Sequence, residues 1–175
     1  MILLPLSRLD VNSLPTTWTY DGFGRTILEV RADGNRTSTS YDYCSGVNGG
    51  SAACPTNGAY RITSTPQNSS GAQNGPQVVV HADALGRTFA NDIQGPGGRV
   101  IRTATQFNTY GLPAQTSRPY YTDNGTPRWS VMAYDVLGRV TQANDVGWEP
   151  MALKETGCMG IPLLGANIAP KTEKD

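Results

Sequence analysis

Few side chains in this sequence have types and spacings suited to catalysis or metal binding. The single histidine, His81, and the three cysteines total four nominal zinc ligands, but they are scattered and include no Cys-x-x-Cys pair. The Gly-Gly-Ser-Ala-Ala segment at 49–53 lacks the final glycine of a nucleophile elbow. The commonest general base is scarce in a chain with one histidine. The residues therefore predict no catalytic, cofactor or metal site, and we expect a protein that is not an enzyme.

Two of the cysteines have a spacing that suits a small covalent loop. Cys44 and Cys54 flank a segment rich in Gly, Ser and Asn. In an oxidising compartment they would form a disulfide that stabilises the loop by about 2–3 kcal/mol, whereas in the cytosol they would remain thiols. Spacing alone does not establish the pairing, so both states stay open. Cys158 lies apart, in the C-terminal segment.

A group of aromatic residues is a candidate for sugar contact. Tyr120, Tyr121 and Trp129 occur together, with Arg118 and Arg128 as polar neighbours. Flat rings beside polar side chains suit stacking on the apolar face of a sugar. The same rings also suit cross-strand pairing in an antiparallel sheet, and we favour that structural interpretation.

Composition excludes several classes of function. Among 175 residues, 14 Lys and Arg balance 14 Asp and Glu, so the chain lacks the positive charge expected of a nucleic-acid binder. No apolar run reaches the length of a membrane span. The apolar start at 2–6 is interrupted by Pro5 and follows no charged region, so we expect no signal peptide.

The composition also predicts where the chain divides. Before residue 147 there is no lysine and only one glutamate, Glu29, while Thr, Tyr, Val and Ile are frequent and favour strands. We therefore predict a lead-in at 1–16 and a β region at 17–146 with a Gly/Ser/Asn-rich loop at 44–58. A partly disordered tail is predicted at 147–175.

A short motif recurs in the β region. Four copies begin at Tyr20, Ala82, Phe107 and Tyr134, and a partial copy begins at Tyr41. Each has Asp or Asn in the second position and Gly three residues later, which is typical of a type I turn capped by the Asp or Asn side chain. The residues assigned to this turn motif are Tyr20, Asp21, Gly24, Arg25, Asp83, Gly86, Arg87, Asn108, Gly111, Tyr134, Asp135, Gly138 and Arg139.

Each motif predicts a strand, a tight turn and a second strand, so the fold is predicted to be an all-β array of antiparallel hairpins. The arginine after each glycine is expected to stack on a Tyr of an adjacent repeat or to pair with an Asp there. The long step from Asp42 to Asp83 suggests a lost or disguised turn. Asp33-Gly34 and Asn124-Gly125 predict two-residue hairpins between the main turns.

The centre of each turn carries an apolar residue, which is expected to anchor the turn to its neighbour. These residues are Phe23, Leu85, Tyr110 and Leu137.

The recurring Tyr-Asp-x-x-Gly-Arg string resembles the YD repeat of RHS-repeat proteins. The best match is 20–43, where Asp33-Gly34-Asn35 stands midway between two copies, and the resemblance covers about 17–146. It implies repeats that wind into a spiral β-sheet. In longer members this sheet closes into a hollow shell, and in many bacterial members the shell encloses a C-terminal toxin. Four turns are too few to close a shell, so the resemblance implies an incomplete shell.

The resemblance also implies partners and a location. The partners would be the remainder of an RHS shell or a toxin cargo, and the aromatic group adds cell-surface glycans. Neither nucleic acid nor a membrane span is expected. The location would be secreted or cell-surface as part of a larger system, and cytoplasmic for this fragment alone. No Asp-Pro pair occurs, so the aspartyl self-cleavage site of some family members is not transferred to this chain.

The sequence therefore favours a non-catalytic RHS/YD-repeat scaffold fragment, part of the shell of a bacterial toxin or cell-surface protein. Two alternatives stay open. One is a carbohydrate- or surface-binding β module that uses the aromatics near 118–134. The other is the remnant of a polymorphic toxin whose effector domain is missing.

Overall fold

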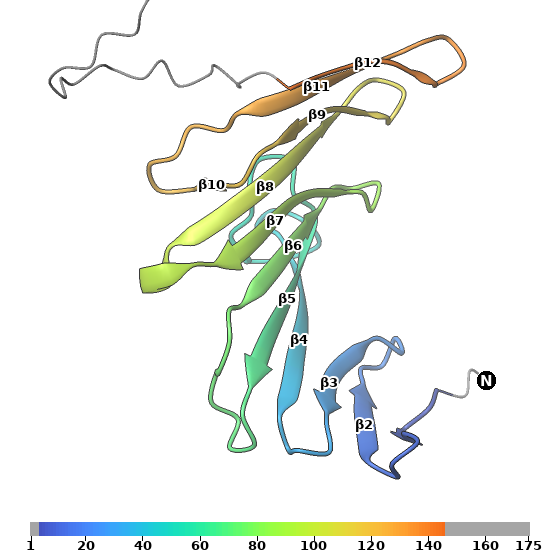
Figure 1. Cartoon of the computed structure of the whole chain (residues 1–175), viewed down its shortest axis with the longest axis vertical. Coiled ribbons are helices and arrows are strands. Elements are labelled where there is room, and N and C mark those ends of the chain that lie inside the picture. The colour runs from blue at the N-terminus through green and yellow to red at the C-terminus, as the bar shows by residue number, and fades with distance from the viewer. Residues whose placement is uncertain (1–3, 146–175) are drawn as a thin grey trace, which may run out of the picture.

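The computed structural model describes residues 4–145, which form one antiparallel sheet of twelve strands (Figure 1). The strands follow one another across the sheet in chain order, except that β10 pairs with β8 beside the main path. The all-β prediction is confirmed. The strands are β1 (Ser7–Leu9), β2 (Pro15–Tyr20), β3 (Thr26–Val30), β4 (Arg36–Tyr43), β5 (Tyr60–Gln67), β6 (Val78–Ala82), β7 (Thr88–Gln94), β8 (Val100–Phe107), β9 (Pro113–Ser117), β10 (Tyr120–Tyr121), β11 (Trp129–Tyr134) and β12 (Val140–Asp145).

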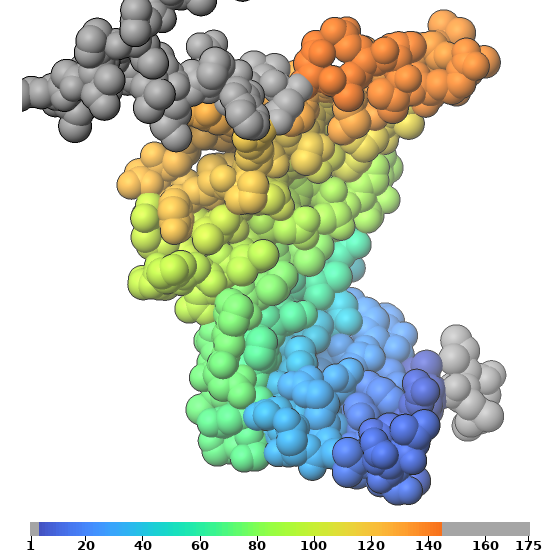
Figure 2. All heavy atoms as spheres, in the orientation of Figure 1, coloured from blue at the N-terminus to red at the C-terminus, as the bar shows by residue number. Residues whose placement is uncertain are grey.

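The sheet is strongly twisted. Strands near β2 run along the long axis of the view, whereas β11 and β12 run nearly across it (Figure 1). The right-handed twist between neighbouring strands adds up over many strands to such a change of direction. In the space-filling view, the colour changes steadily from blue at the bottom to orange at the top, so the strands follow one another in chain order (Figure 2).

The sheet has no thick hydrophobic core. Among the described residues, the buried apolar side chains are small ones, and no large side chain is fully buried. Most strand residues are half-buried, and β2 alternates between exposed and half-buried positions as a strand does. The sheet is therefore a single layer. Part of one face, over β6 to β8, is lined by residues of the connection 44–59 between β4 and β5.

The predicted motif turns all lie at one end of the strands. Because each hairpin reverses the chain, alternate connections fall at opposite ends of an antiparallel sheet. The end that we call the motif end holds the turns at 21–25, 83–87, 108–112 and 135–139 together with the connection 44–59. The opposite end holds the remaining connections.

The long step from Asp42 to Asp83 contains no lost turn at the motif end, but it contains a capped turn at 68–72 at the opposite end. Strands β4, β5 and β6 are direct neighbours, so only one connection at the motif end separates these two aspartates. The extra length lies in that connection, 44–59, and in the ten-residue connection 68–77 at the opposite end. The sequence step was misleading because it cannot distinguish a missing hairpin from an enlarged one.

The described part of the predicted lead-in belongs to the sheet, because β1 pairs with β2. The predicted tail at 147–175, with Cys158, lies outside the described residues. A hairpin is present at Asp33-Gly34, between β3 and β4, but its loop is longer than two residues, and the hairpin predicted at Asn124-Gly125 is wrong. Gly34 closes a five-residue turn at 31–35, and Asn124-Gly125 lies between β10 and β11, which do not pair with each other.

Candidate functional site

Each full motif turn is held by a set of hydrogen bonds to one carboxylate. Asp21 Oδ1 accepts the backbone N–H groups of Phe23 and Arg25, both at 2.9 Å. Arg25 Nε and Nη2 each donate to Asp21 Oδ2 at 2.7 Å. The Gly24 N–H donates to the Asp21 carbonyl at 3.0 Å, and Gly24 has a φ of 80°. A type I turn followed by a left-handed residue is the usual way to close a three-residue hairpin loop.

The other copies repeat this geometry. Asp83 and Asp135 make the same contacts to the residues two and four positions on, including a guanidinium. Asn108 keeps the two backbone contacts, but Leu112 stands where the arginine would be. The motif therefore fixes both the turn and the position of an arginine side chain at its exit.

These hydrogen bonds favour the charged form of the turn carboxylates. The backbone N–H of the following arginine is the main cause of the lowered pKa of Asp21 and of Asp135. At Asp83, burial acts to raise the pKa, but the bonds from Arg87 outweigh it and the pKa is lowered.

Four further connections use the same backbone frame, which sequence reasoning missed. They are the turns at 10–14, 31–35, 68–72 and 95–99. Asn68 caps its turn as Asp21 does, and the signal was present as Asn followed three residues later by Gly71. At 10–14 the glycine position holds Ser13, whose φ is 60°. These connections lack the aromatic residue that precedes most motif turns, so they do not match the recurring string.

Two of the motif arginines, Arg25 and Arg87, contact the aromatic residue of the next repeat. The guanidinium carbon of Arg25 lies 4.2 Å from the centre of the Tyr41 ring, and that of Arg87 lies 4.3 Å from the Phe107 ring. The predicted stacking is thus present at Tyr41, and at a Phe in the second case. The alternative pairing with a neighbouring repeat's Asp is absent from residues 4–145 for the motif arginines, because the Asp of the same turn already holds the guanidinium.

Two tyrosines at this motif position, Tyr41 and Tyr134, also hydrogen-bond backward with their hydroxyl groups. Tyr41 Oη donates to the carbonyl of Thr26, the residue after Arg25, at 3.2 Å. Tyr134 Oη donates to the carbonyl of Pro113 at 2.7 Å, in the same relation to the preceding turn. Each of these tyrosines therefore contacts the residue that follows one motif turn, and it stands shortly before the next connection at the motif end. We call this set of contacts the interlock.

The apolar residues at the turn centres do not anchor neighbouring turns. Phe23, Leu85, Tyr110 and Leu137 are each at least 74% exposed. The prediction was wrong because the centre of a turn lies beyond the ends of the strands, where no neighbouring strand reaches it.

The disulfide lies in the connection 44–59, which lines part of one face of the sheet, called here the covered face. Cys44 and Cys54 are bonded, with Cα atoms 5.6 Å apart, and Cys44 is buried. A Cβ on Gly58 would lie 2.8 Å from the Cys54 Cβ, so glycine lets the connection pass close to the bridge. The segment 53–55 then lies along a hollow on the sheet face.

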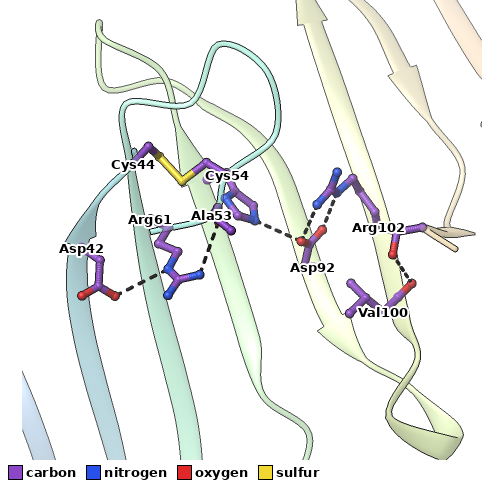
Figure 3. Close-up of polar contacts among 10 residues, drawn as sticks. Asp42, Cys44, Ala53, Cys54, Arg61, Asp92, Val100 and Arg102 are labelled. Carbon is purple, nitrogen blue, oxygen red and sulfur yellow. Dashed lines mark hydrogen bonds and ion pairs between the residues drawn. A yellow bond between two sulfur atoms is a disulfide. The ribbon is translucent and has the colours of Figure 1, made fainter. Parts of the chain in front are cut away.

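Beside the disulfide lies a buried cluster of charged residues (Figure 3). The Asp92 carboxylate accepts hydrogen bonds from Arg102 Nε at 2.6 Å and Nη2 at 2.7 Å, and its Oδ2 lies 3.0 Å from His81 Nε2. His81 is 3% exposed and Asp92 8%. Burial acts to raise the pKa of Asp92, but the hydrogen bonds from Arg102 and His81 lower it to about 2.

Sequence reasoning missed this cluster because it joins three strands. His81 lies in β6, and only the register of β6, β7 and β8 brings it to Asp92 and Arg102. The only signal in the sequence was that each of the three residues lies within a segment whose pattern predicts a strand.

The predicted sugar-contact residues are only partly brought together. Tyr120 and Trp129 line one hollow of about 630 Å³ on the covered face, with Asn57 at its rim. Tyr121 is not part of that lining, and the guanidinium of Arg99 lies 3.7 Å from the centre of its ring. Two of the three rings are therefore placed for a shared contact.

Within residues 4–145, no group of three or more His, Cys, Asp or Glu side chains is arranged to hold a metal ion. The same residues contain no helix with the length and apolar character that a membrane crossing requires. Neither a protein-family model nor a curated protein matches the chain.

Proposed function

We propose that this chain is a non-catalytic scaffold, a segment of the wall of a shell of the RHS/YD-repeat type that surrounds or supports another polypeptide. The observation that carries the proposal is the interlock. Arg25 rests on the Tyr41 ring while the Tyr41 hydroxyl bonds the Thr26 carbonyl. The ring contact recurs between Arg87 and Phe107, and the hydroxyl contact recurs between Tyr134 and the Pro113 carbonyl. Such contacts between neighbouring repeats extend a sheet without needing a central core.

The single layer supports the same proposal. A globular binding domain buries large apolar side chains between layers, but the buried apolar side chains of residues 4–145 are all small. Both faces of the sheet are partly open, which suits a wall that has solvent on one side and a cargo on the other. The strong twist suits the spiral winding that such shells need (Figure 1).

The disulfide supports a location outside the reducing cytosol. Bridges such as Cys44–Cys54 persist in secreted and cell-surface proteins. We therefore propose that the chain acts as part of a secreted or cell-surface system.

An internal duplication tests the wall proposal. A second copy of 83–107 is inserted directly after Phe107, so that a phenylalanine precedes both the added Asp turn and the Asn108 turn. A repeat wall accepts the extra hairpin, and we expect β-sheet circular dichroism, a longer particle in small-angle scattering and an unchanged or higher urea midpoint.

The matched control carries Ala in place of the Asp and Arg of the added turn. We expect it to be less stable than the intact duplication. If both insertions lower stability equally or unfold the chain, the array is not modular and the wall proposal fails.

A carbohydrate-binding module is the second candidate, and one observation favours it. Tyr120 and Trp129 share a hollow whose lining also offers the polar side chains of Asn57, Asp83 and Gln106. Rings and polar groups in a hollow of this size suit a sugar unit.

A glycan-array screen tests this candidate. Wild type is compared with Trp129→Ala, and Tyr121→Ala serves as the control because Tyr121 lies outside the hollow lining. Binding that Trp129→Ala abolishes and Tyr121→Ala keeps would support the module. Equal behaviour of all three proteins would exclude it.

A further inference from the structure

A hollow of about 490 Å³ lies between the disulfide-linked segment 53–55 and strands β5 to β8. Four ionisable side chains line it: Arg61 from β5, His81 from β6, Asp92 from β7 and Arg102 from β8. Figure 3 shows Arg61 beside Ala53, and it shows Asp92 and Arg102 together on the neighbouring strands farther along the sheet. The wall function proposed above does not require a buried charged hollow.

Two nitrogen atoms at this hollow have no hydrogen-bond partner. Arg61 Nε and His81 Nδ1 are both buried, and neither has a hydrogen-bond partner among the described residues. The two residues are directly opposite each other in the β5–β6 ladder, so their side chains lie on the same face of the sheet. Buried polar atoms without partners are rare in folded proteins, and two adjacent ones call for an acceptor or donor that fits both.

The existing charges leave Arg61 incompletely neutralised. Its Nε lies 3.6 Å from Asp42 Oδ2, and its Nη1 lies 3.4 Å from the Ala53 carbonyl, both long for a hydrogen bond. Asp92 is not free to serve Arg61, because Arg102 engages both of its oxygens and His81 engages one. The charged lining of the hollow therefore has an excess of positive charge, and an anion is its electrostatic complement.

The protonation of His81 decides what kind of group fits. Because Nε2 faces the Asp92 carboxylate, Nε2 carries the proton in the neutral ring, and Nδ1 becomes a donor only when the ring takes up a second proton. Arg61 Nε is always a donor. We propose that the hollow binds a small oxyanion, a carboxylate or phosphate group, between Arg61 and His81, and that His81 Nδ1 takes up one proton as the anion binds.

The groups that face His81 determine this coupling. Arg61 on β5 and Arg102 on β8 oppose a positive charge on the ring, whereas Asp92 on β7 favours it. On the covering segment, Cys54 is in the disulfide and does not titrate. A bound oxyanion adds a second negative charge beside the ring, so anion and proton bind cooperatively.

Nitrogen NMR of the full chain tests the proposal directly. Because His81 is the only histidine, its two imidazole ¹⁵N signals are unambiguous. Sodium phosphate, sodium acetate and sodium chloride are added at equal ionic strength near pH 7. We expect phosphate or acetate, but not chloride, to move the Nδ1 signal to the position of a protonated nitrogen. If phosphate moves the signal, the site takes a phosphate group, and if acetate moves it, the site takes a carboxylate.

Calorimetry with variants gives the second readout. Binding of the active anion is expected to be about tenfold weaker in Arg61→Gln and in His81→Gln, which keep polar side chains of similar size. Wild type should take up about one proton per anion, measured as a dependence of the binding heat on the ionisation enthalpy of the buffer.

Arg36→Gln is the matched control. Arg36 Nε is also buried without a partner, but Arg36 lies on β4 and does not line the hollow. The control should bind the anion as wild type does. If Arg61→Gln and Arg36→Gln bind the anion equally, or if the Nδ1 signal of wild type responds to no anion, the site does not exist. The NMR result on wild type decides the matter even where a variant fails to fold.

Discussion

At the scale of single residues, the tyrosine of the motif acts through two separate parts. Its ring receives the guanidinium of the preceding turn, as Tyr41 receives Arg25. Its hydroxyl donates to the carbonyl that follows that arginine. Phe107 keeps the first contact with Arg87 but has no hydroxyl for the second. The aromatic position therefore tolerates Phe at the cost of one hydrogen bond.

The first prediction follows from this comparison. Phe107→Tyr should place a hydroxyl near the Thr88 carbonyl, which stands in the same relation to Arg87 as Thr26 does to Arg25. We expect a gain of about 0.5–1.5 kcal/mol in the free energy of unfolding, measured by urea denaturation. Phe23→Tyr, at an exposed turn centre, is the control and should change nothing. A destabilised Phe107→Tyr would show that the second contact does not form there.

The second prediction concerns Asp92 and pH. Its pKa is lowered from 3.8 to about 2 in the folded state, so its stabilising contribution is full above the ordinary pKa and is lost as pH falls through about 2. Asp92→Asn should therefore be about 2 kcal/mol less stable than wild type near neutral pH. The difference should shrink as the pH falls from about 4 to about 2.

Urea denaturation at several pH values measures this difference. Asp123→Asn, which breaks the exposed pair with Arg99, is the control and should have a much smaller effect. A gap between Asp92→Asn and wild type that stays constant down to about pH 2 would contradict the assignment.

At the scale of elements, the five-residue turn is the unit from which the sheet is built. Gly24, Gly86, Gly111 and Gly138 have φ values of 77–80°, a region that residues with a Cβ rarely adopt. At Gly86 an added Cβ would meet only Tyr60 Oη at 3.8 Å, an ordinary contact. Any cost of substitution there comes from the backbone rather than from a steric clash.

The third prediction tests that turn. Gly86→Val should lower the free energy of unfolding by about 2 kcal/mol, because a β-branched residue resists the left-handed conformation. Gly22→Val is the matched control, since Gly22 lacks a positive φ and has open space around its Cβ position. Equal thermal melts for the two variants would mean that the turn geometry is wrong.

The fourth prediction concerns the connection 44–59. Replacing Cys44 and Cys54 by Ala should cost about 2–3 kcal/mol, because the unfolded chain is no longer held in a closed loop. Denaturation of wild type with and without a reducing agent should give the same difference, and the double variant should not respond to the reductant. A double variant as stable as oxidised wild type would show that the bridge contributes nothing.

Local features of these elements could be predicted from the sequence, and features that need the strand register could not. The Asp21 turn is decided by contacts within five residues, so its pattern is visible in the chain. The His81–Asp92 contact depends on which residues of β6 and β7 face each other, and no local pattern encodes that. The exposure of Phe23 was missed because apolar character alone does not show whether a neighbouring strand reaches the turn centre.

At the scale of the whole molecule, residues 4–145 form a layer rather than a globule. With only small apolar side chains buried, the sheet derives its stability from ladder hydrogen bonds, the interlock and ion pairs such as Arg102–Asp92. Little apolar surface is then exposed when the chain unfolds.

The fifth prediction follows from this small change in exposed surface. The urea m-value, which scales with the surface exposed on unfolding, should be at or below about 1 kcal/mol per M. Tryptophan fluorescence and far-ultraviolet circular dichroism both measure it. An m-value typical of a two-layer domain of this length would indicate that large surfaces are buried against something that the single layer does not show.

One consequence of the interlock concerns where the chain tolerates new sequence. Tyr41 makes its backward contacts from the strand that arrives at the motif end, before the connection 44–59 begins. The link between repeats is thus complete before the chain enters the turn, and the length of the connection does not disturb it. A hairpin of five residues and a disulfide-closed excursion of sixteen can occupy equivalent places in the array. The connection 44–59 is therefore a natural grafting point, where a foreign peptide can be displayed without altering the spacing of the strands.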